Sequence, residues 1–265
     1  MQLEIQKMQG AGNQILIVDQ RENESLSPTT EILNIVRNSE IGANFDQLMW
    51  LSRPQNKTSI TSYRVFNYDG SEVEQCGNGV RCVAILLARD HPQQGEFLLE
   101  SPAGIITARV LGPRRASVNM GTPQFDDAIS ILDVGGADIS VNIVSMGNPH
   151  CVLDVADVAT ADVAGLGPAI EHHEQFVQRI NVGFMHIVDR NNIDLRVYER
   201  GAGETLACGT GACAAVASGH RRGLLDDEVS VRLPGGQLVV SWRGGVDTVW
   251  LTGDADFLSE GKIDL

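Results

Sequence analysis

Two cysteines stand in the same short motif at two points of the chain, and the motif suits proton-transfer chemistry. Cys76 lies in EQCGNGVRC and Cys208 in LACGTGAC, so both have the pattern Cys-Gly-polar-Gly. In both places a strand-and-turn segment leads into an expected helix, whose first backbone N–H groups are unpaired and partly positive. That field favours a thiolate, and the glycines let a ligand approach the backbone. Each motif is therefore expected to be a reactive thiol beside an anion-binding site.

The two motifs belong to an internal repeat. With an offset of 132 residues, residues 63–79 lie over residues 195–211, and with an offset of 135, residues 12–19 lie over residues 147–154. Besides the cysteines and their glycines, the identities include Arg64/Arg196, Glu72/Glu204, Gly12/Gly147 and Asn13/Asn148. Because the matches keep their order over most of each half, they predict two lobes of like topology related by a pseudo-twofold axis.

Such symmetry would give the two thiols opposite positions on one substrate. The two helix starts would face each other across the lobe interface, and a carboxylate between them would accept N–H bonds from both. The sulfurs of Cys76 and Cys208 would then flank the carbon that bears the carboxylate. Inverting an α-carbon needs a base on one face and an acid on the other, so the motif pair predicts racemisation or epimerisation. The backbone donors would stabilise the charge that develops on the carboxylate.

Other roles for the cysteines remain open from the residues alone. Both could be buried core residues, since free cysteine is often buried. A Cys76–Cys208 disulfide is conceivable, although a cytosolic setting disfavours it as the resting state; thiols that flank one carbon could form it when the site is empty. Covalent catalysis with His150 would leave one thiol without a role. A carboxylate-binding or redox-sensing module is the nonenzymatic alternative. The core interpretation is preferred for Cys82, Cys151 and Cys213.

Composition narrows the function classes. The chain has 265 residues, 43% of them hydrophobic, and a net charge of −14, which argues against a nucleic-acid partner. No signal peptide or membrane-spanning run is recognised, and five cysteines without a secretory signal favour a reducing cytoplasm. The absence of C-x-x-C spacing argues against structural zinc. Only three lysines occur, none in a motif typical of a pyridoxal phosphate site, so no cofactor is expected.

The elements that must position the cysteines repeat in each half. Apolar and alternating runs predict strands at residues 15–19, 47–51, 61–67 and 104–110, and again at 151–155, 184–188, 193–199 and 237–244. Helical stripes are expected at residues 78–90 and 210–222. This predicts an α+β fold in which each lobe wraps a mixed sheet around a central helix, with the active site in the cleft between lobes. The expected domains are residues 1–118, joined by a C-terminal strand at 255–265, and residues 119–254, with a junction near 120–127.

Four stretches resemble a known family in their order and spacing. FNYDGSEVEQCGNGVR, MGNPHCV, RINVGF and YERGAGETLACGTGA are similar to the signature stretches of diaminopimelate epimerases, and the resemblance covers essentially the whole chain. It implies a cofactor-independent, two-lobed protein that forms a homodimer. It also implies interconversion of LL- and meso-2,6-diaminopimelate on the route to lysine and peptidoglycan. A racemase of another amino acid, such as histidine, is the enzymatic alternative on the same fold.

The resemblance also implies roles for particular residues. The two bases would be Cys76 and Cys208. The reacting carboxylate would be held by the backbones of Gly77, Asn78, Gly209 and Thr210. The reacting end would be oriented by Asn13 and Gln47, with His150 and Glu199 near its amino group. The distal end would be gripped by Asn67, Asn148, Asn181, Glu199 and Arg200. The chain departs from the family pattern at Gln14-Ile15, where Asp-Phe is common, which bears on packing and substrate range.

Overall fold

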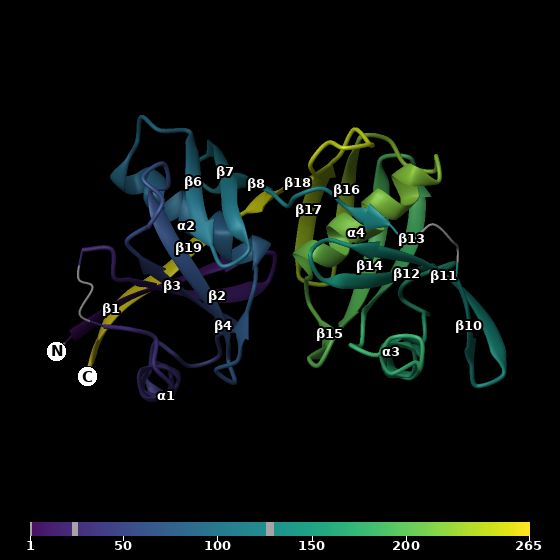
Figure 1. The fold of residues 1–265 in the computed structure, drawn as a ribbon, viewed down its shortest axis with the longest axis horizontal. Helices are drawn as coiled ribbons and strands as arrows, with labels where there is room; N and C mark the ends of the chain where they lie inside the picture. The colour runs from purple at the N-terminus through teal and green to yellow at the C-terminus, as the bar shows by residue number, and fades with distance from the viewer. Residues whose placement is uncertain (1, 23–25, 126–129) are drawn as a thin grey trace. The chain divides into compact units, whose positions relative to one another are not determined.

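The chain forms two compact units. A computed structural model describes residues 2–22, 26–125 and 130–265 (Figure 1). Met1–Asn119 and Thr252–Leu265 make up the first unit, and Met120–Leu251 the second. Of the expected junction at residues 120–127, the last two positions lie outside the described residues. The mixed α+β character predicted from the sequence is confirmed.

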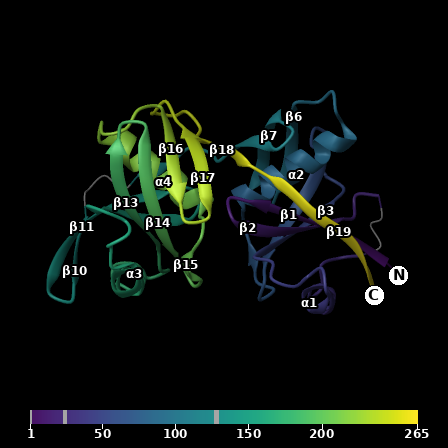
Figure 2. The ribbon, with the colours of Figure 1, turned by 180° about the vertical axis from the view of Figure 1, so that it is seen from behind.

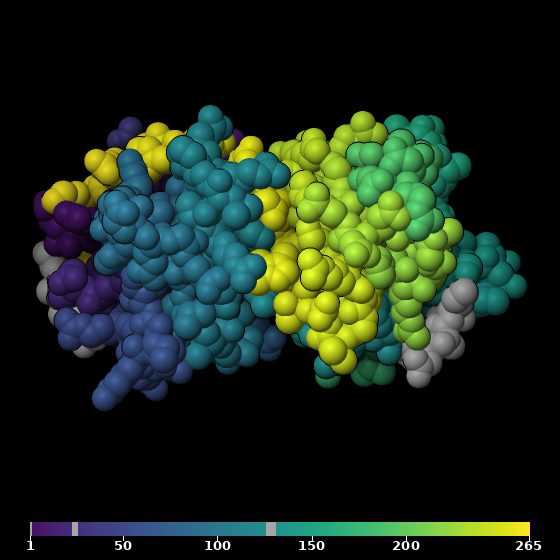
Figure 3. All heavy atoms as spheres, turned by 90° about the horizontal axis from the view of Figure 1, so that it is seen from above, coloured from purple at the N-terminus to yellow at the C-terminus, as the bar shows by residue number. Residues whose placement is uncertain are grey.

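A mixed sheet forms the framework of the first unit. Its strands are β1 (Gln2–Gly10), β2 (Asn13–Asp19), β3 (Gln47–Ser52), β4 (Thr61–Asn67), β5 (Glu72–Val73), β6 (Glu96–Ser101), β7 (Gly104–Gly112), β8 (Arg115–Asn119) and β19 (Asp256–Asp264). Neighbours pair in the order β19, β1, β2, β3, β4, β6, β7 and β8, and β5 pairs with β4. The pairs β2–β3 and β4–β6 are parallel and the others antiparallel. The two ends of the chain therefore lie side by side in β1 and β19 (Figures 2 and 3).

Two helices complete the first unit. Helix α2 (Gly77–Asp90) is buried along its length as far as Leu87 and contacts β1, β2, β3, β7 and β8. Helix α1 (Thr30–Asn38) is amphipathic, and its apolar residues pack on a core cluster that includes Leu3, Leu16 and Trp50. A fully buried helix is apolar on all sides, which explains the dense apolar run after Gly77.

The second unit is built in the same way. Its strands are β9 (Gln124–Phe125), β10 (Ser130–Val134), β11 (Ala137–Ser145), β12 (Pro149–Asp154), β13 (Asn181–Asp189), β14 (Asn192–Glu199), β15 (Gly203–Thr205), β16 (Glu228–Leu233) and β17 (Gly236–Ser241); β18 (Trp250–Asp254) begins in this unit and ends in the first. Its helices are α3 (Val163–Glu171) and α4 (Gly209–Arg221). Helix α4 contacts β11, β12, β13, β14 and β17.

The succession of elements repeats between the units. A hairpin, β1–β2 or β11–β12, is followed by a helix and by a strand parallel to the hairpin's second strand. An antiparallel strand comes next, with a short β5 or β15 paired to it. The buried helix α2 or α4 then leads to a parallel strand, β6 or β16. Cys76 and Cys208 thus each precede the equivalent helix, α2 or α4, of a unit with the same order of elements.

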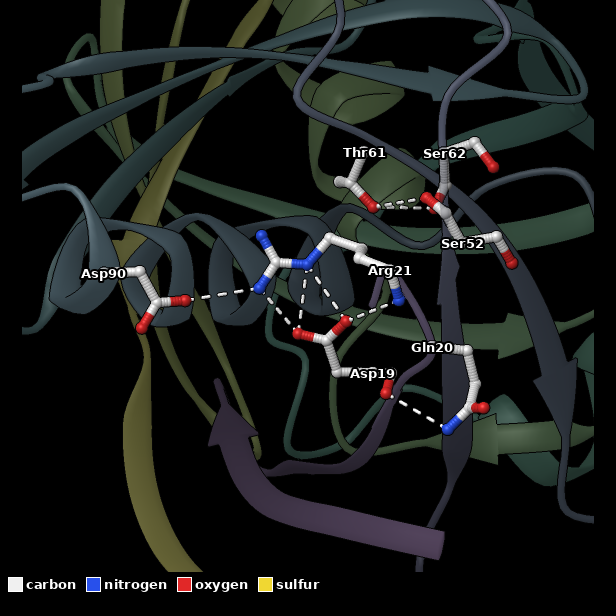
Figure 4. Close-up of polar contacts among 7 residues, drawn as sticks. All are labelled: Asp19, Gln20, Arg21, Ser52, Thr61, Ser62 and Asp90. Atoms are coloured by element: carbon white, nitrogen blue, oxygen red, sulfur yellow. Dashed lines mark hydrogen bonds and ion pairs between the residues drawn. The ribbon is translucent and has the colours of Figure 1, made fainter. Parts of the chain in front are cut away.

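An ion-pair cluster ties the far end of α2 to the sheet. Arg21 follows β2 and its guanidinium binds both carboxylate oxygens of Asp19, with its Nη2 2.6 Å from Oδ2. The same Nη2 donates to Asp90, the last residue of α2, at 3.2 Å (Figure 4). A cation at a helix C-terminus is favourable. Arg21 therefore fixes the end of the helix opposite to Cys76.

Candidate active site

Cys76 is the N-cap residue of α2. Its backbone is extended (φ −138°, ψ 101°), and its sulfur accepts a hydrogen bond from the N–H of Gly79 at 3.1 Å. Its carbonyl oxygen accepts from the N–H of Val80 at 2.9 Å. The residue is 7% exposed. The sulfur thus takes the place that a serine or aspartate oxygen commonly has at a helix start, where the positive end of the helix dipole favours its anionic form.

Cys208 has the same place at the start of α4. Its backbone is extended (φ −122°, ψ 110°), and its sulfur accepts from the N–H of Gly211 at 3.4 Å. Its carbonyl oxygen accepts from the N–H of Ala212 at 2.9 Å, and the residue is 4% exposed. The repeated motif therefore produces two N-cap thiols of matching local geometry, one in each unit.

The second glycine of each motif leaves room for the sulfur. A Cβ on Gly79 would lie 3.3 Å from the sulfur of Cys76 and 2.5 Å from the sulfur of Met49. A Cβ on Gly211 would lie 3.2 Å from the sulfur of Cys208 and 3.1 Å from a methyl of Val197. At Gly79 the helix therefore approaches β3 more closely than a side chain would allow, and at Gly211 the approach to β14 is tight.

Burial and charge raise the pKa of Cys208. Burial raises the pKa of this thiol well above its ordinary value, and the carboxylate of Glu199 raises it further. The Thr210 hydroxyl, 3.5 Å from the sulfur, and the N–H of Gly211 act in the opposite direction. Cys208 is thus held as a thiol next to a carboxylate that can share its proton.

The other three cysteines are core residues, as expected. Cys82, Cys151 and Cys213 are each fully buried. Burial raises the pKa of Cys82 and of Cys151 to about 12. Within each unit, no two of these cysteines are joined by a disulfide bond.

A chain of hydrogen bonds leads from His150 toward Cys208. The Nδ2 of Asn148 donates to the Thr210 hydroxyl at 3.3 Å, and its Oδ1 lies 3.1 Å from the Nε2 of His150. The amide orientation therefore requires the tautomer of His150 that has its proton on Nε2. Burial, with a smaller effect of Arg200, lowers the pKa of His150 to about 3. His150 is thus neutral near pH 7 and acts as a donor rather than as a cation.

Asn181, Glu199 and Arg200 meet where β13 begins and β14 ends. The Nδ2 of Asn181 donates to the carbonyl of Pro149 at 2.8 Å, and its Oδ1 accepts from the backbone N–H of Arg200 at 3.0 Å. The hydroxyl of Thr205 donates to Glu199 at 2.5 Å. In the second unit, contacts therefore connect Glu199 to Cys208 and connect Asn148 and His150 to Thr210. Asn181 and Arg200 are joined to each other at the adjoining strand ends.

The first unit has a smaller polar set. Gln47 and Asn67 face each other across β3 and β4, and the Nε2 of Gln47 donates to the Oδ1 of Asn67 at 3.3 Å. Asn13 begins β2, the neighbour of β3. At the positions where the chain departs from the family pattern, the backbone N–H of Gln14 donates to Asp46 at 2.7 Å, and Ile15 is fully buried.

Sequence reasoning missed two residues that hold members of these sets. Arg81 is fully buried and donates from Nη2 to the Oδ1 of Asn78 at 2.7 Å. Its position one turn into an apolar helix was the available signal, because a charged residue there needs a buried acceptor. Thr205, which binds Glu199, gives no such signal in the sequence.

The structure groups the expected residues unit by unit. The first unit holds Asn13, Gln47, Asn67, Cys76, Gly77 and Asn78, and the second holds Asn148, His150, Asn181, Glu199, Arg200, Cys208, Gly209 and Thr210. Among residues 2–22, 26–125 and 130–265, no three His, Cys, Asp or Glu side chains are grouped to hold a metal ion. In the same part of the chain no helix has the length and apolar character needed to cross a membrane.

Comparison of the sequence with known families gives a consistent result. The family described as diaminopimelate epimerase matches residues 5–126 and 142–258. A protein from Acinetobacter baumannii (strain AYE) named diaminopimelate epimerase is 43% identical, with 100% of this chain and 98% of that protein covered. One of the same name from Nitrosomonas europaea is 45% identical, with both chains fully covered.

Solved structures that resemble the chain share its fold at low sequence identity. A hydroxyproline epimerase from Agrobacterium vitis has a TM-score of 0.76 at 15% identity, with 99% of this chain and 92% of that chain covered. A Bacillus anthracis protein of the PhzF phenazine biosynthesis family has the same TM-score and identity, with both chains fully covered. At this identity the likeness establishes the fold alone.

Proposed function

The chain belongs to the diaminopimelate epimerase family, and we propose that it interconverts LL- and meso-2,6-diaminopimelate with two cysteine thiols as the acid and the base. The enzyme class is isomerase, and the family places it in lysine biosynthesis. Relatives from Acinetobacter and Nitrosomonas that are 43–45% identical have this name, so the alternative of a racemase for another amino acid is not favoured.

The observation that best supports the mechanism is the repeated N-cap thiol. Cys76 and Cys208 are each the N-cap of a buried helix, and each sulfur accepts a hydrogen bond from the N–H of the third residue after it. That third residue is a glycine in both motifs, and a Cβ there would crowd the sulfur. We propose that the two units are lobes related by a pseudo-twofold axis, so that the helix starts face one substrate in a cleft between them.

In the proposed reaction one sulfur, as thiolate, takes the α-proton and becomes a thiol. The other sulfur, as thiol, delivers its proton to the opposite face and becomes a thiolate, so the proton count of the enzyme is unchanged. The electron pair left on the α-carbon is delocalised onto the carboxylate. The first N–H groups of α2 and α4, at Gly77, Asn78, Gly209 and Thr210, would stabilise that charge. No cofactor takes part in this scheme.

The polar sets are proposed to bind the rest of the substrate. Arg200 can bind the distal carboxylate through two N–H groups, while Glu199 and the asparagines suit an ammonium group. Asn13 and Gln47 would orient the reacting end, with the neutral His150 near its amino group. Asn67, Asn148 and Asn181 would complete the distal grip. We further propose a cytoplasmic homodimer, as the family resemblance implies.

Deuterium exchange tests the function directly. The protein is incubated with LL-diaminopimelate in deuterium oxide without added cofactor, and the products are examined by mass spectrometry and chiral chromatography. We expect the meso isomer, with one solvent deuterium at the inverted carbon. Parallel incubation with L-histidine tests the other amino-acid class. Failure to form deuterated meso product would contradict the proposal.

A further inference from the structure

Glu171 is a buried carboxylate that the proposed reaction does not use. It ends α3, and its side chain is 3% exposed. A carboxylate in such a place needs hydrogen bonds or opposite charges to offset its lost hydration. Its Oε1 accepts from the backbone N–H of Gly201 at 2.8 Å and lies 3.7 Å from Nη1 of Arg179, and its Oε2 lies 3.5 Å from Nδ1 of His172. The shortest of these contacts is the bond to the loop after β14.

That loop follows directly on Glu199 and Arg200. The N–H of Arg200 is fixed by Asn181, and the next N–H, of Gly201, is fixed by Glu171. Gly201 has a φ of +75°, in the left-handed region, so the chain turns sharply here. The guanidinium of Arg200 donates from Nη1 to the carbonyl of Gln178 at 3.2 Å. Two side chains from two other elements therefore hold the backbone on both sides of the Arg200 Cα.

The position of α3 against β14 depends on close packing as well. A Cβ on Gly167 would lie 2.6 Å from the ring of Tyr198, the residue before Glu199. The helix thus lies directly on the end of the strand, and Glu171 reaches past that contact to the turn. The Glu171 carboxylate therefore acts on Glu199 and Arg200 through the backbone of the turn, and no contact joins it to either side chain.

We propose that Glu171 is a positioning residue for the turn that holds Glu199 and Arg200, and so for the site that binds the distal end of the substrate. This inference rests on the proposed function. The Glu171 carboxylate would do this as a hydrogen-bond acceptor. Its bond from the N–H of Gly201 would keep the turn in the conformation that directs Arg200 toward the distal carboxylate of the substrate. A displacement of about 1 Å in a substrate-binding group is enough to weaken binding and turnover by large factors.

Three variants of the full chain separate positioning from simple stabilisation. Glu171→Ala removes the acceptor, Glu171→Gln keeps an acceptor oxygen, and Asp162→Ala weakens the same helix at its other end, where Asp162 accepts from the N–H of Gly165 at 2.9 Å. The measurements are the Kd for LL-diaminopimelate by titration calorimetry, kcat and KM by deuterium exchange, and Tm. We expect Glu171→Ala to raise Kd and KM by about tenfold, the value of one hydrogen bond of ordinary to high strength. Glu171→Gln should stay within about threefold of the parent.

The control and the double variant decide the outcome. Asp162→Ala should lower Tm and leave Kd unchanged. Adding Glu171→Ala to Arg200→Ala should weaken binding by less than the product of the single effects, because both act through one group. An unchanged Kd in Glu171→Ala, or a Kd effect that Asp162→Ala matches at equal loss of Tm, would overturn the inference. If the parent binds substrate without exchanging the α-hydrogen, the proposed reaction fails while the Kd comparison still tests Glu171.

Discussion

The hydroxyl oxygen of Thr210 lies 3.5 Å from the sulfur of Cys208 and accepts a hydrogen bond from the side-chain amide of Asn148. Because Asn148 supplies one hydrogen to this oxygen, the hydroxyl's own hydrogen is available for the sulfur. The corresponding residue of the other motif, Asn78, instead accepts a bond from Arg81. The two thiols therefore share their helix-cap geometry and differ in the polar group beside them.

Thr210→Val should slow turnover and move its pH dependence to higher pH. The hydroxyl donates to the anionic form of Cys208, so its loss raises a pKa that burial has already raised. Because a hydrogen bond to a charged group is a strong one, we expect its loss to lower kcat/KM by about tenfold or more. Thr210→Ser, which keeps the hydroxyl, is the matched control. The measurement is kcat/KM for deuterium exchange between pH 6 and 10; identical pH profiles for the valine variant and the parent would argue against this role.

Cys76→Ala and Cys208→Ala should each abolish epimerisation in both directions. The reaction needs a thiolate to take the proton on one face and a thiol to return one on the opposite face, so inversion does not complete with a single sulfur. General acid or base groups contribute about 10²- to 10⁴-fold, and we expect losses at the upper end of that range. Initial rates from LL- and from meso-substrate measure the effect. Cys82→Ala, at a core cysteine, is the control, and a motif variant with rates like those of Cys82→Ala would contradict the assignment.

Gly79→Ala should destabilise the first unit through Met49. The new Cβ would lie 2.5 Å from the Met49 sulfur, which must move. Overpacking of this kind costs about 1–3 kcal/mol. Met49→Ala alone leaves a cavity, but together with Gly79→Ala it supplies room for the added methyl, so the double variant should lose less stability than the two single losses combined. Urea denaturation gives the free energies of unfolding. If the two losses of stability are strictly additive, the contact between the new Cβ and the Met49 sulfur is not what destabilises Gly79→Ala.

The sequence predicted the buried helices well because their signals are local. The apolar stripe after Gly77 and the small residues after Gly209 give α2 and α4 within a residue of their observed starts. The shorter helices α1 and α3 were not predicted. Helix α3 contains Pro168 and two glycines, and it is held by its Asp162 cap and by contact with Tyr198 rather than by propensity.

The sequence could suggest candidate residues where the type of side chain determines the chemistry. It could not give properties that depend on how those side chains are packed. The cysteine pair was predicted from the repeated motif and the polar residues from the family resemblance, whereas the neutral state of His150 depends on burial that no local pattern shows. Glu72 and Glu204, which match in the repeat, form paired ion contacts with Arg64 and Arg196. The acceptor role of Glu171 was not predicted, because Gly201 lies 30 residues away in the sequence.

Arg196→Ala should cost more stability than Arg64→Ala, although the two arginines are equivalent in the repeat. Both bind a glutamate through two N–H groups. Arg64 is 46% exposed, and exposed pairs contribute about 0–1 kcal/mol. Arg196 is 24% exposed and also donates to the carbonyl of Val158 at 2.8 Å, so its loss leaves an acceptor unpaired. We expect a difference of about 1–2 kcal/mol in urea denaturation. Equal losses would contradict the argument.

His150 should make the protein less stable in mild acid. Its pKa of about 3 in the folded state lies below the ordinary value of 6.5, so the unfolded chain binds a proton first as the pH falls. Stability from this residue is therefore complete above about pH 6.5 and decreases toward pH 3, by about 2 kcal/mol between pH 7 and pH 5. His150→Gln removes that term, so its free energy of unfolding should change less than the parent's over this interval. His91→Gln, at an exposed position, controls for the loss of a histidine. The measurement is urea denaturation at pH 7 and pH 5. A parent and a His150→Gln variant with equal pH dependence would show that His150 is not held neutral.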